Sequence, residues 1–353
     1  MISQEVLYFG IFSLGILAIL VLDLTVIGRN SHVLSLKEAG IWTGVWVSLA
    51  LLFYVFIIFH GDKFHSINNL NDLLALQEKY APQLKLDLSS FENSLEIYRK
   101  NMGMEYLSGY LIEYTLSMDN VFVIMLILSG FAVREKYYKQ VLFWGILGAI
   151  ILRFFFIFIG AALIQKFEWI LLLFGAFLVF TGIRLFINRD NDDKIEPQDH
   201  WLVKFLSKHF RVYPRYFKDH FFVRSKKIFY ITPLFIVLLL VEVTDVIFAT
   251  DSIPAIFAVT RDPYLVFFSN IFAIIGLRSL FFLLMRVMNV FHYLNIGISF
   301  LLVFVGFKLL FHSWLDKIGF SSVYSLYVIL LTLALCVVFS ILFPKKEEID
   351  SVK

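Results

Sequence analysis

Two short stretches of this chain carry acidic residues inside otherwise apolar runs. The first, EYTLSMDNVF (113–122), holds Glu113 and Asp119, and the second, DVIFATDSIP (245–254), holds Asp245 and Asp251. In both, an Asp follows the first acid at the same spacing and precedes a small polar residue. A charge at the centre of a membrane-spanning helix costs about 2.5–3.5 kcal/mol on insertion scales, so such residues usually face a partner or an interior cavity. The acids therefore indicate function.

The residues around these acids offer a set of oxygen ligands. Carboxylate, amide, hydroxyl and carbonyl oxygens suit Mg²⁺, Ca²⁺ and Mn²⁺, and the two acidic segments contain no His or Cys that would favour zinc or copper. Pro254 cannot donate a backbone hydrogen bond, which frees the carbonyl of Thr250 as a further ligand. The candidate metal ligands are Glu113, Asp119, Asn120, Glu242, Asp245, Thr250, Asp251 and Ser252. For Glu242, pairing with a neighbouring helix is an equally good interpretation.

Basic residues are also present in the apolar runs, but they are fewer than the acids. Arg153 and Arg278 are expected to be counter-ions that hold the acidic helices in place, whereas Arg184 and Lys308 lie near helix ends where they can reach water. Because the acids outnumber the bases, salt bridges alone would leave some carboxylates unpaired. A buried, unpaired carboxylate requires a proton or a cation. Because six residues of helix rise about 9 Å, we expect two acidic layers about 9 Å apart, with Glu113 level with Asp251 and Asp119 level with Asp245.

Composition places these residues in an all-α polytopic membrane protein. The 353-residue chain is 59% hydrophobic and its mean hydropathy is +0.80, above the 45–50% apolar content of ordinary soluble domains. The single cysteine, Cys336, excludes an internal disulfide, a Cys-rich zinc site and an iron–sulfur cluster. Nine apolar runs are each long enough to span a bilayer: 6–27, 38–59, 105–130, 139–164, 167–187, 229–257, 264–288, 290–311 and 321–343.

The distribution of Lys and Arg predicts the orientation and the loops. Most basic residues fall in the segments that are cytoplasmic if the N-terminus is outside and the C-terminus inside. Two loops are long. External residues 61–104 contain LNDLLALQEKY and SFENSLEIYRK, which could form short surface helices, and cytoplasmic residues 189–228 contain HWLVKFLSKHF, which suits a helix on the membrane or one packed beneath the bundle.

The apolar runs contain an internal repeat. Residues 105–187 and 229–311 align with Glu113 on Asp245, Arg153 on Arg278 and Gly182 on Gly306, in the same order. Because each unit has three helices, the second must enter the membrane from the opposite side. This is the inverted-repeat plan of secondary transporters, whose sites lie near the membrane midplane where the repeats meet.

Three ordered segments carry a family resemblance: EYTLSMDNVFV, FFVRSKKIFYITPLF and VEVTDVIFATDSIPAIFAVTRDPYLVFFSNIFAIIGLRSLFF. They resemble the signature segments of the TerC family of integral membrane proteins, the tellurium-resistance TerC or Alx group, which belongs with LysE-like exporters. The resemblance implies a single TerC-type domain over 1–353 and manganese export. It maps the family's acidic motif onto Glu113, Asp119, Asn120, Glu242, Asp245, Asp251 and Ser252. The 61–104 loop is longer than the family leads us to expect.

These observations predict a multi-pass protein of the bacterial inner membrane that exports a divalent cation, with Mn²⁺ as the first candidate. The expected partners are lipid and the ion, with no nucleic acid and no resident cofactor. The alternative is a non-transporting scaffold for membrane-protein assembly or for the tellurite or metal stress response, which predicts a closed, fully salt-bridged acidic cluster. An enzyme is not expected, because the GxGD and HExxH motifs of intramembrane proteases are missing from the sequence.

Overall fold

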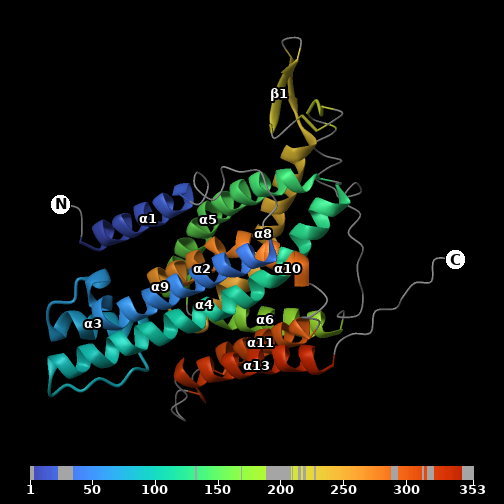
Figure 1. Cartoon of the computed structure of the whole chain (residues 1–353). Coiled ribbons are helices and arrows are strands. Elements are labelled where there is room, and N and C mark those ends of the chain that lie inside the picture. The colour runs from blue at the N-terminus through green and yellow to red at the C-terminus, as the bar shows by residue number, and fades with distance from the viewer. Residues whose placement is uncertain are drawn as a thin grey trace.

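The computed structural model describes residues 4–22, 35–131, 133–167, 169–187, 208, 210–213, 216–217, 220–225, 228–287, 293–311, 314–315 and 322–343. Long helices run alongside one another and form a bundle (Figure 1). Their bounds are α1 Gln4–Leu22, α2 Leu36–His60, α3 Leu70–Tyr80, α4 Phe91–Gly130, α5 Glu135–Lys166, α6 Trp169–Ile187, α8 Pro233–Phe257, α9 Pro263–Ile275, α10 Leu277–Val287, α11 Leu294–Leu310 and α13 Ser322–Leu342.

Each of the nine predicted spans overlaps at least one of these helices, but a full set of nine spans is not confirmed. Among the described residues, three helices are long and apolar enough to cross a bilayer by themselves: 36–65, 135–164 and 233–257. The pair α9 and α10 would make a fourth span, bent by 41° at Gly276. Large apolar side chains such as Leu52 and Phe180 face outward with more than half of their surface exposed, which suits a lipid environment. The chain is a helical integral membrane protein.

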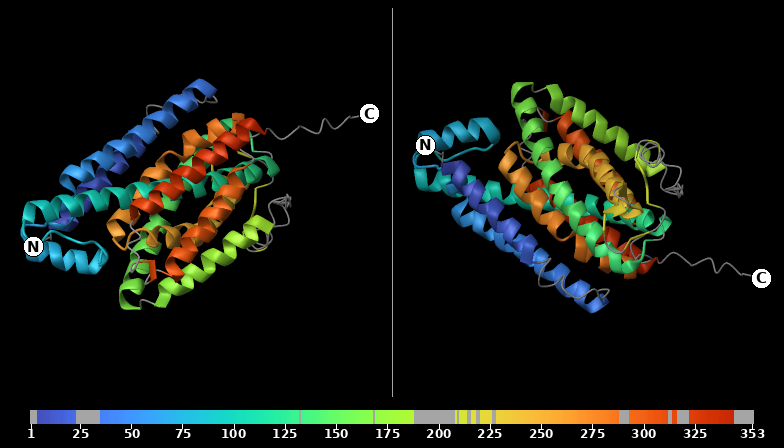
Figure 2. Two further views of the ribbon diagram at one scale, coloured as in Figure 1. Left: turned by 90° about the horizontal axis from the view of Figure 1, so that it is seen from below. Right: turned by 90° about the horizontal axis from the view of Figure 1, so that it is seen from above.

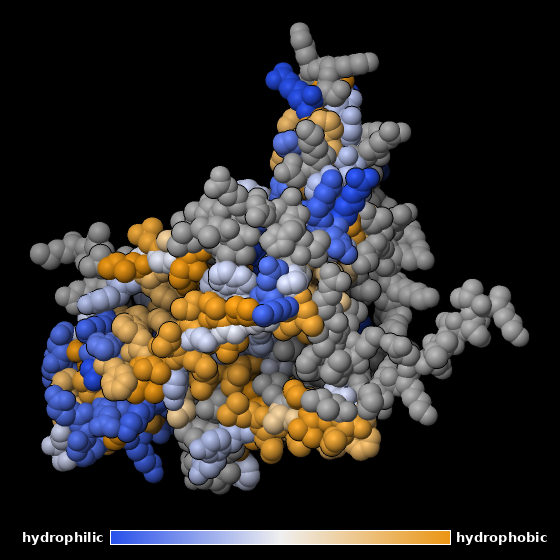
Figure 3. All heavy atoms as spheres, viewed as in Figure 1, coloured by the Kyte–Doolittle hydropathy of each residue, from blue (hydrophilic) through white to orange (hydrophobic). Residues whose placement is uncertain are grey.

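Apolar and polar side chains occupy different parts of the molecular surface. Figure 3 shows apolar residues over the middle of the bundle and polar residues gathered at the end that carries α3. At this end the predicted helix 70–80 is confirmed as α3, which begins where the Asn69 side chain accepts a hydrogen bond from the Asp72 amide. The second predicted surface helix is instead the first part of α4, a continuous helix of 40 residues.

The polar end is fastened to the bundle by buried contacts. The 3-10 helix η2 (Gly61–His65) follows α2, and the His65 ring nitrogen Nε2 lies 2.7 Å from Oδ2 of Asp262. Asp262 is also the N-cap of α9, where its side chain accepts from the Tyr264 amide. The 61–104 loop is therefore packed against the helix that follows α8.

Residues 222–231 add a small β-hairpin to the predicted all-α architecture. Strands β1 (Phe222–Ser225) and β2 (Ile228–Ile231) form an antiparallel hairpin that projects from the bundle (Figure 1). The predicted span 229–257 starts too early, because aromatic and β-branched residues favour the strand and Pro233 then occupies the first turn of α8, after its N-cap Thr232. The predicted cytoplasmic helix in 200–210 falls almost wholly outside the described residues.

Helices α6 and α11 pack at very short range beside α13 (Figures 1 and 2). A Cβ added at Gly182 would lie 2.8 Å from the Ser299 carbonyl oxygen of α11, and one added at Gly306 would lie 2.7 Å from the Gly175 carbonyl oxygen of α6. Residue numbers fall along one helix as they rise along the facing one, so α6 and α11 are antiparallel. Glycine is needed here because no larger residue allows the backbones this close.

Candidate functional site

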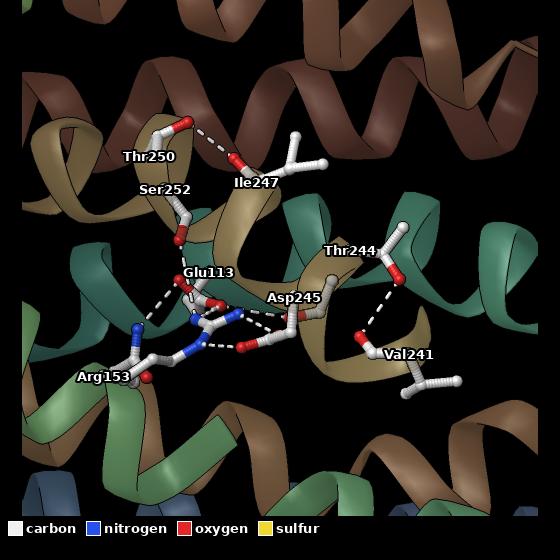
Figure 4. Close-up of polar contacts among 10 residues, drawn as sticks. Glu113, Arg153, Val241, Thr244, Asp245, Ile247, Thr250 and Ser252 are labelled. Atoms are coloured by element: carbon white, nitrogen blue, oxygen red, sulfur yellow. Dashed lines mark hydrogen bonds and ion pairs between the residues drawn. The ribbon is translucent and has the colours of Figure 1, made fainter. Parts of the chain in front are cut away.

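The centre of the candidate site is Arg153, which α5 carries into the space between α4 and α8 (Figure 4). Its side chain is fully buried. Nε donates to Oδ2 of Asp245 at 3.2 Å and Nη2 donates to Oδ1 at 2.9 Å, while Nη1 donates to Oε1 of Glu113. The guanidinium thus makes a bidentate contact with Asp245, which is the strong geometry for an arginine–carboxylate pair. The prediction that Arg153 is a counter-ion is confirmed.

Glu113 is held by three helices. Its side chain is fully buried on α4, and its Oε1 accepts from the Ser117 hydroxyl at 3.2 Å in addition to Arg153. Its Oε2 accepts from Nδ2 of Asn270, on α9, at 3.0 Å. Both oxygens are therefore hydrogen-bonded, as a buried carboxylate requires.

The shared arginine joins the two acids that the sequence places in different layers. Glu113 and Asp245 contact one guanidinium, and the nitrogen that contacts Glu113 also lies 3.5 Å from Oγ of Ser252, the neighbour of Asp251. The level of Glu113 with Asp251 and of Asp119 with Asp245 stays a prediction. The side chains of Asp119 and Asp251 lie outside what the structure describes, so their places in the site stay predictions.

The two remaining candidates near Asp251 face different surroundings. Ser252 is buried and its Oγ lies 3.5 Å from Nη1 of Arg153, at the limit of a hydrogen bond. Thr250 is exposed, and its hydroxyl donates to the Ile247 carbonyl at 2.6 Å, on the side of α8 away from Arg153 (Figure 4). The Thr250 side chain is thus not part of the Arg153 cluster.

Glu242 lies one helical turn before Asp245 on α8 and is half-buried. Its Oε2 is buried and has no hydrogen-bond partner among the described residues. The carboxylate rests against Gly148 of α5, where an added Cβ would overlap it. Gly148 therefore makes the room that this acid occupies, and the described part of the chain supplies no counter-ion for it.

Asn120 presents a second buried oxygen without a partner. Glu113, Ser117 and Asn120 are spaced so that they lie on one face of α4. Asn120 is only 4% exposed, and within the described ranges its Oδ1 accepts no hydrogen bond. Buried polar atoms in this condition are uncommon and call for a specific explanation.

Within the described residues, no three His, Cys, Asp or Glu side chains gather as a metal site would require. The described donors that fit a hard divalent cation are carboxylate, amide and hydroxyl oxygens. Of the carboxylates, Glu113 and Asp245 are engaged by Arg153, and Glu242 is not.

Comparison with known proteins decides the family. Residues 98–348 match the family described as integral membrane protein TerC family. The chain belongs to the TerC family. It is 40% identical over 305 residues, 86% of this chain and 85% of the relative, to a proposed membrane-bound redox modulator, Alx, of Escherichia coli (strain K12). It is also 40% identical over 294 residues, covering 83% of this chain and 80% of the relative, to the membrane protein STKORF319 of Myxococcus xanthus.

Membership of the TerC family confirms the resemblance drawn from the motifs. A membrane protein of Rickettsia bellii is 36% identical over 309 residues, 86% of this chain and 88% of its own. No solved structure matches this TerC protein. The family match begins at residue 98, after α3 and most of the 61–104 segment.

Asn270 is the site residue that sequence reasoning missed. It is fully buried on α9 and donates to Glu113. The available signal was an amide inside the apolar span 264–288, in the stretch FSNIFAIIG that precedes Arg278. A polar residue in such a span generally has a partner within the protein.

Proposed function

We propose that this TerC protein exports a divalent cation, with Mn²⁺ as the first candidate. The observation that carries the proposal is a pair of buried oxygens without described partners, Glu242 Oε2 and Asn120 Oδ1, beside the Arg153 cluster. Carboxylate and amide oxygens are ligands that Mn²⁺ accepts, and ionisable groups inside a membrane bundle commonly mark ion pathways.

Helix direction places both oxygens toward the same end of the bundle. Glu242 precedes Asp245 by one turn of α8, and Asn120 follows Glu113 by two turns of α4. Because α4 and α8 run in opposite directions (Figure 1), the two residues lie on one side of the shared Arg153. In the proposed orientation, with the N-terminus outside, this is the cytoplasmic side, from which an exported ion must enter.

The reciprocal glycine contacts support two inverted repeats, 105–187 and 229–311. Gly182 meets Ser299 and Val303, whereas Gly306 meets Gly175 and Val179. The shift that aligns Gly182 with Gly306 also carries Gly175 to Ser299 and Val179 to Val303, so each contact is the image of the other. A two-fold relation of this kind is what alternating access between inverted repeats uses.

The test is transport of Mn²⁺ into inverted membrane vesicles that contain the full chain. We expect uptake with the wild-type protein and its loss in Asp119→Asn and Asp251→Asn. The proposed ligands are these two aspartates together with Glu113, Asn120, Glu242, Asp245, the Thr250 carbonyl and Ser252. Vesicles that stay free of Mn²⁺ with the wild type would refute export, and full transport by either variant would refute the site. The ion is cargo in this proposal, and the protein is a transporter of the inner membrane, not an enzyme.

The second candidate is a membrane scaffold or modulator that moves no ion. The closed contact among Glu113, Arg153 and Asp245 favours it, as does the description of the Alx relatives as redox modulators. Against it, the described residues leave Glu242 outside any salt bridge, so the acidic cluster is not fully neutralised by bases. Cellular Mn content with and without expression separates the two: a scaffold leaves it unchanged, whereas an exporter lowers it.

A further inference from the structure

We propose that Arg153 is a built-in counter-cation whose guanidinium occupies the place of the transported ion between Glu113 and Asp245, so that the ion binds there only when the guanidinium withdraws. This inference rests on the proposed export. It assigns Arg153 a competing role in addition to the structural role of an ion-pair partner.

The first argument is that arginine and ion need the same oxygen atoms. Both oxygens of Asp245 accept from Arg153, and Oε1 of Glu113 accepts from it as well. A hard divalent cation binds carboxylate oxygens at about 2.0–2.6 Å, which is within the space that the guanidinium N–H groups now fill. The ion and the guanidinium therefore cannot occupy the space together.

The second argument is charge. Glu113 and Asp245 together carry two negative charges when ionised, and Arg153 supplies one positive charge in a site where the side chains are 0%, 11% and 0% exposed, respectively. The cluster is left with one excess negative charge. A divalent cation in place of the guanidinium would neutralise the pair fully, so an ion has an electrostatic advantage once the arginine moves.

The third argument is that the arginine links the two three-helix units. Arg153 belongs to α5, in the first three-helix unit, and Asp245 to α8, in the second. The side chain of Glu113 stays anchored by Asn270 and Ser117, but Arg153 is the only described residue whose hydrogen bonds reach Asp245. Ion binding would therefore release this one ion pair between the two units, which favours the relative movement that alternating access needs.

Glu242 supplies a first binding site for the incoming ion. It lies one turn from Asp245, and no partner for its Oε2 is found among the described residues. An ion held there would be close enough to Asp245 to compete with Arg153 without first crossing the closed cluster.

The experiment measures Mn²⁺ binding to the full-length protein in detergent by isothermal titration calorimetry, in a mildly alkaline buffer that limits competition by protons. Arg153→Gln removes the charge, and Arg153→Lys keeps the charge but loses the two-pronged contact. Arg99→Gln is the matched control, because Arg99, near the start of α4, forms a similar contact with Asp62 of η2 at 2.7 Å. Transport into inverted vesicles is measured for the same proteins.

We expect Arg153→Gln to bind Mn²⁺ at least tenfold more tightly than the wild type, Arg153→Lys to fall between them, and Arg99→Gln to match the wild type. Transport by Arg153→Gln should fall although its binding is tighter, because nothing displaces the ion. Equal or weaker binding by Arg153→Gln, with a wild type that transports, overturns the competing role and leaves export intact. If Arg153→Gln does not fold, an Mn²⁺ affinity of Arg153→Lys equal to that of the wild type overturns the competing role. A wild type that neither binds nor transports Mn²⁺ refutes export, and the inference falls with it.

Discussion

The two segments α4–α6 and α8–α11, the second with the bent pair α9 and α10 in place of a single helix, make similar contacts with residues of different chemistry. In the contact between α8 and α5, Glu242 lies against Gly148. The sequence alignment puts Tyr110 where Glu242 stands and Ala273 where Gly148 stands, and Tyr110 and Ala273 lie together in one buried cluster with Ala50. The packing is thus shared between the segments, whereas the acid is present in one of them only.

The same contrast holds for the pair that binds Arg153. Glu113 is supported by Asn270 and Ser117 in addition to the arginine. The aligned positions on the other side are Gly145 and Ala249, which offer no side-chain donor to Asp245. The aligned carboxylates are therefore held unequally in the two segments.

The largest effect is expected from Asp245→Asn compared with Glu113→Gln. Asparagine at 245 leaves the buried fork of Arg153 without its carboxylate, which should cost about 3–5 kcal/mol of stability. Glutamine at 113 keeps its contacts to Asn270 and Ser117 and should cost about 1.5–3 kcal/mol, the value of one hydrogen bond between charged groups. Thermal unfolding of the detergent-solubilised chain measures both. Equal losses would mean that the two acids are held alike.

The glycines of α6 and α11 are expected to give matched effects. Gly182→Ala and Gly306→Ala each force a Cβ to within 2.7–2.8 Å of a facing backbone oxygen, so each should lose about 1–3 kcal/mol by overpacking. Gly44→Ala, on α2 where no atom lies within 4 Å of the added Cβ, is the control and should lose nothing. Tolerance of one of the two buried substitutions in the same unfolding measurement would contradict the two-fold relation of α6 and α11.

Much of the fold could be predicted because its signals are local. The apolar runs locate the long helices, and Asn69 followed by Asp72 marks the start of α3. Arg153 could be recognised as a counter-ion, since a charge in an apolar run needs a partner. The hairpin at 222–231 was missed because FVRSKKIFYI is short and adjoins an apolar helix, and short apolar runs do not distinguish strand from helix.

The arrangement of the site was harder to predict because it depends on where helices cross. The predicted repeat makes Glu113 and Asp245 equivalent, but equivalence does not say whether they meet. Their meeting at Arg153 depends on packing between α4, α5 and α8. Asn270 contributes to the site from α9, a helix with no acid in its apolar run, so no pattern of acids led to it.

Gly148→Ala tests whether Glu242, the acid found in only one of the two segments, takes part in Mn²⁺ transport. The substitution gives α5 the residue that α9 has at Ala273, and its Cβ displaces the Glu242 carboxylate. Because the end of a flexible side chain can move, stability should change by less than about 1 kcal/mol, whereas Mn²⁺ transport into inverted vesicles should fall severalfold, as with Glu242→Gln. Unchanged transport in both variants would make Glu242 a bystander.

Tyr110→Phe should have the smallest effect and completes the comparison from the other side. Tyr110 is buried beside Tyr106 and Tyr114, with ring centroids 6.4 Å and 5.6 Å away, respectively. Phenylalanine keeps this packing, so we expect stability within about 0.5 kcal/mol of the wild type and unchanged Mn²⁺ transport. The result matters because Tyr110 occupies the position aligned with Glu242. A loss of transport in Tyr110→Phe as large as that in Glu242→Gln would show that the hydroxyl serves the ion, and the two sides would then be functionally alike despite their different chemistry.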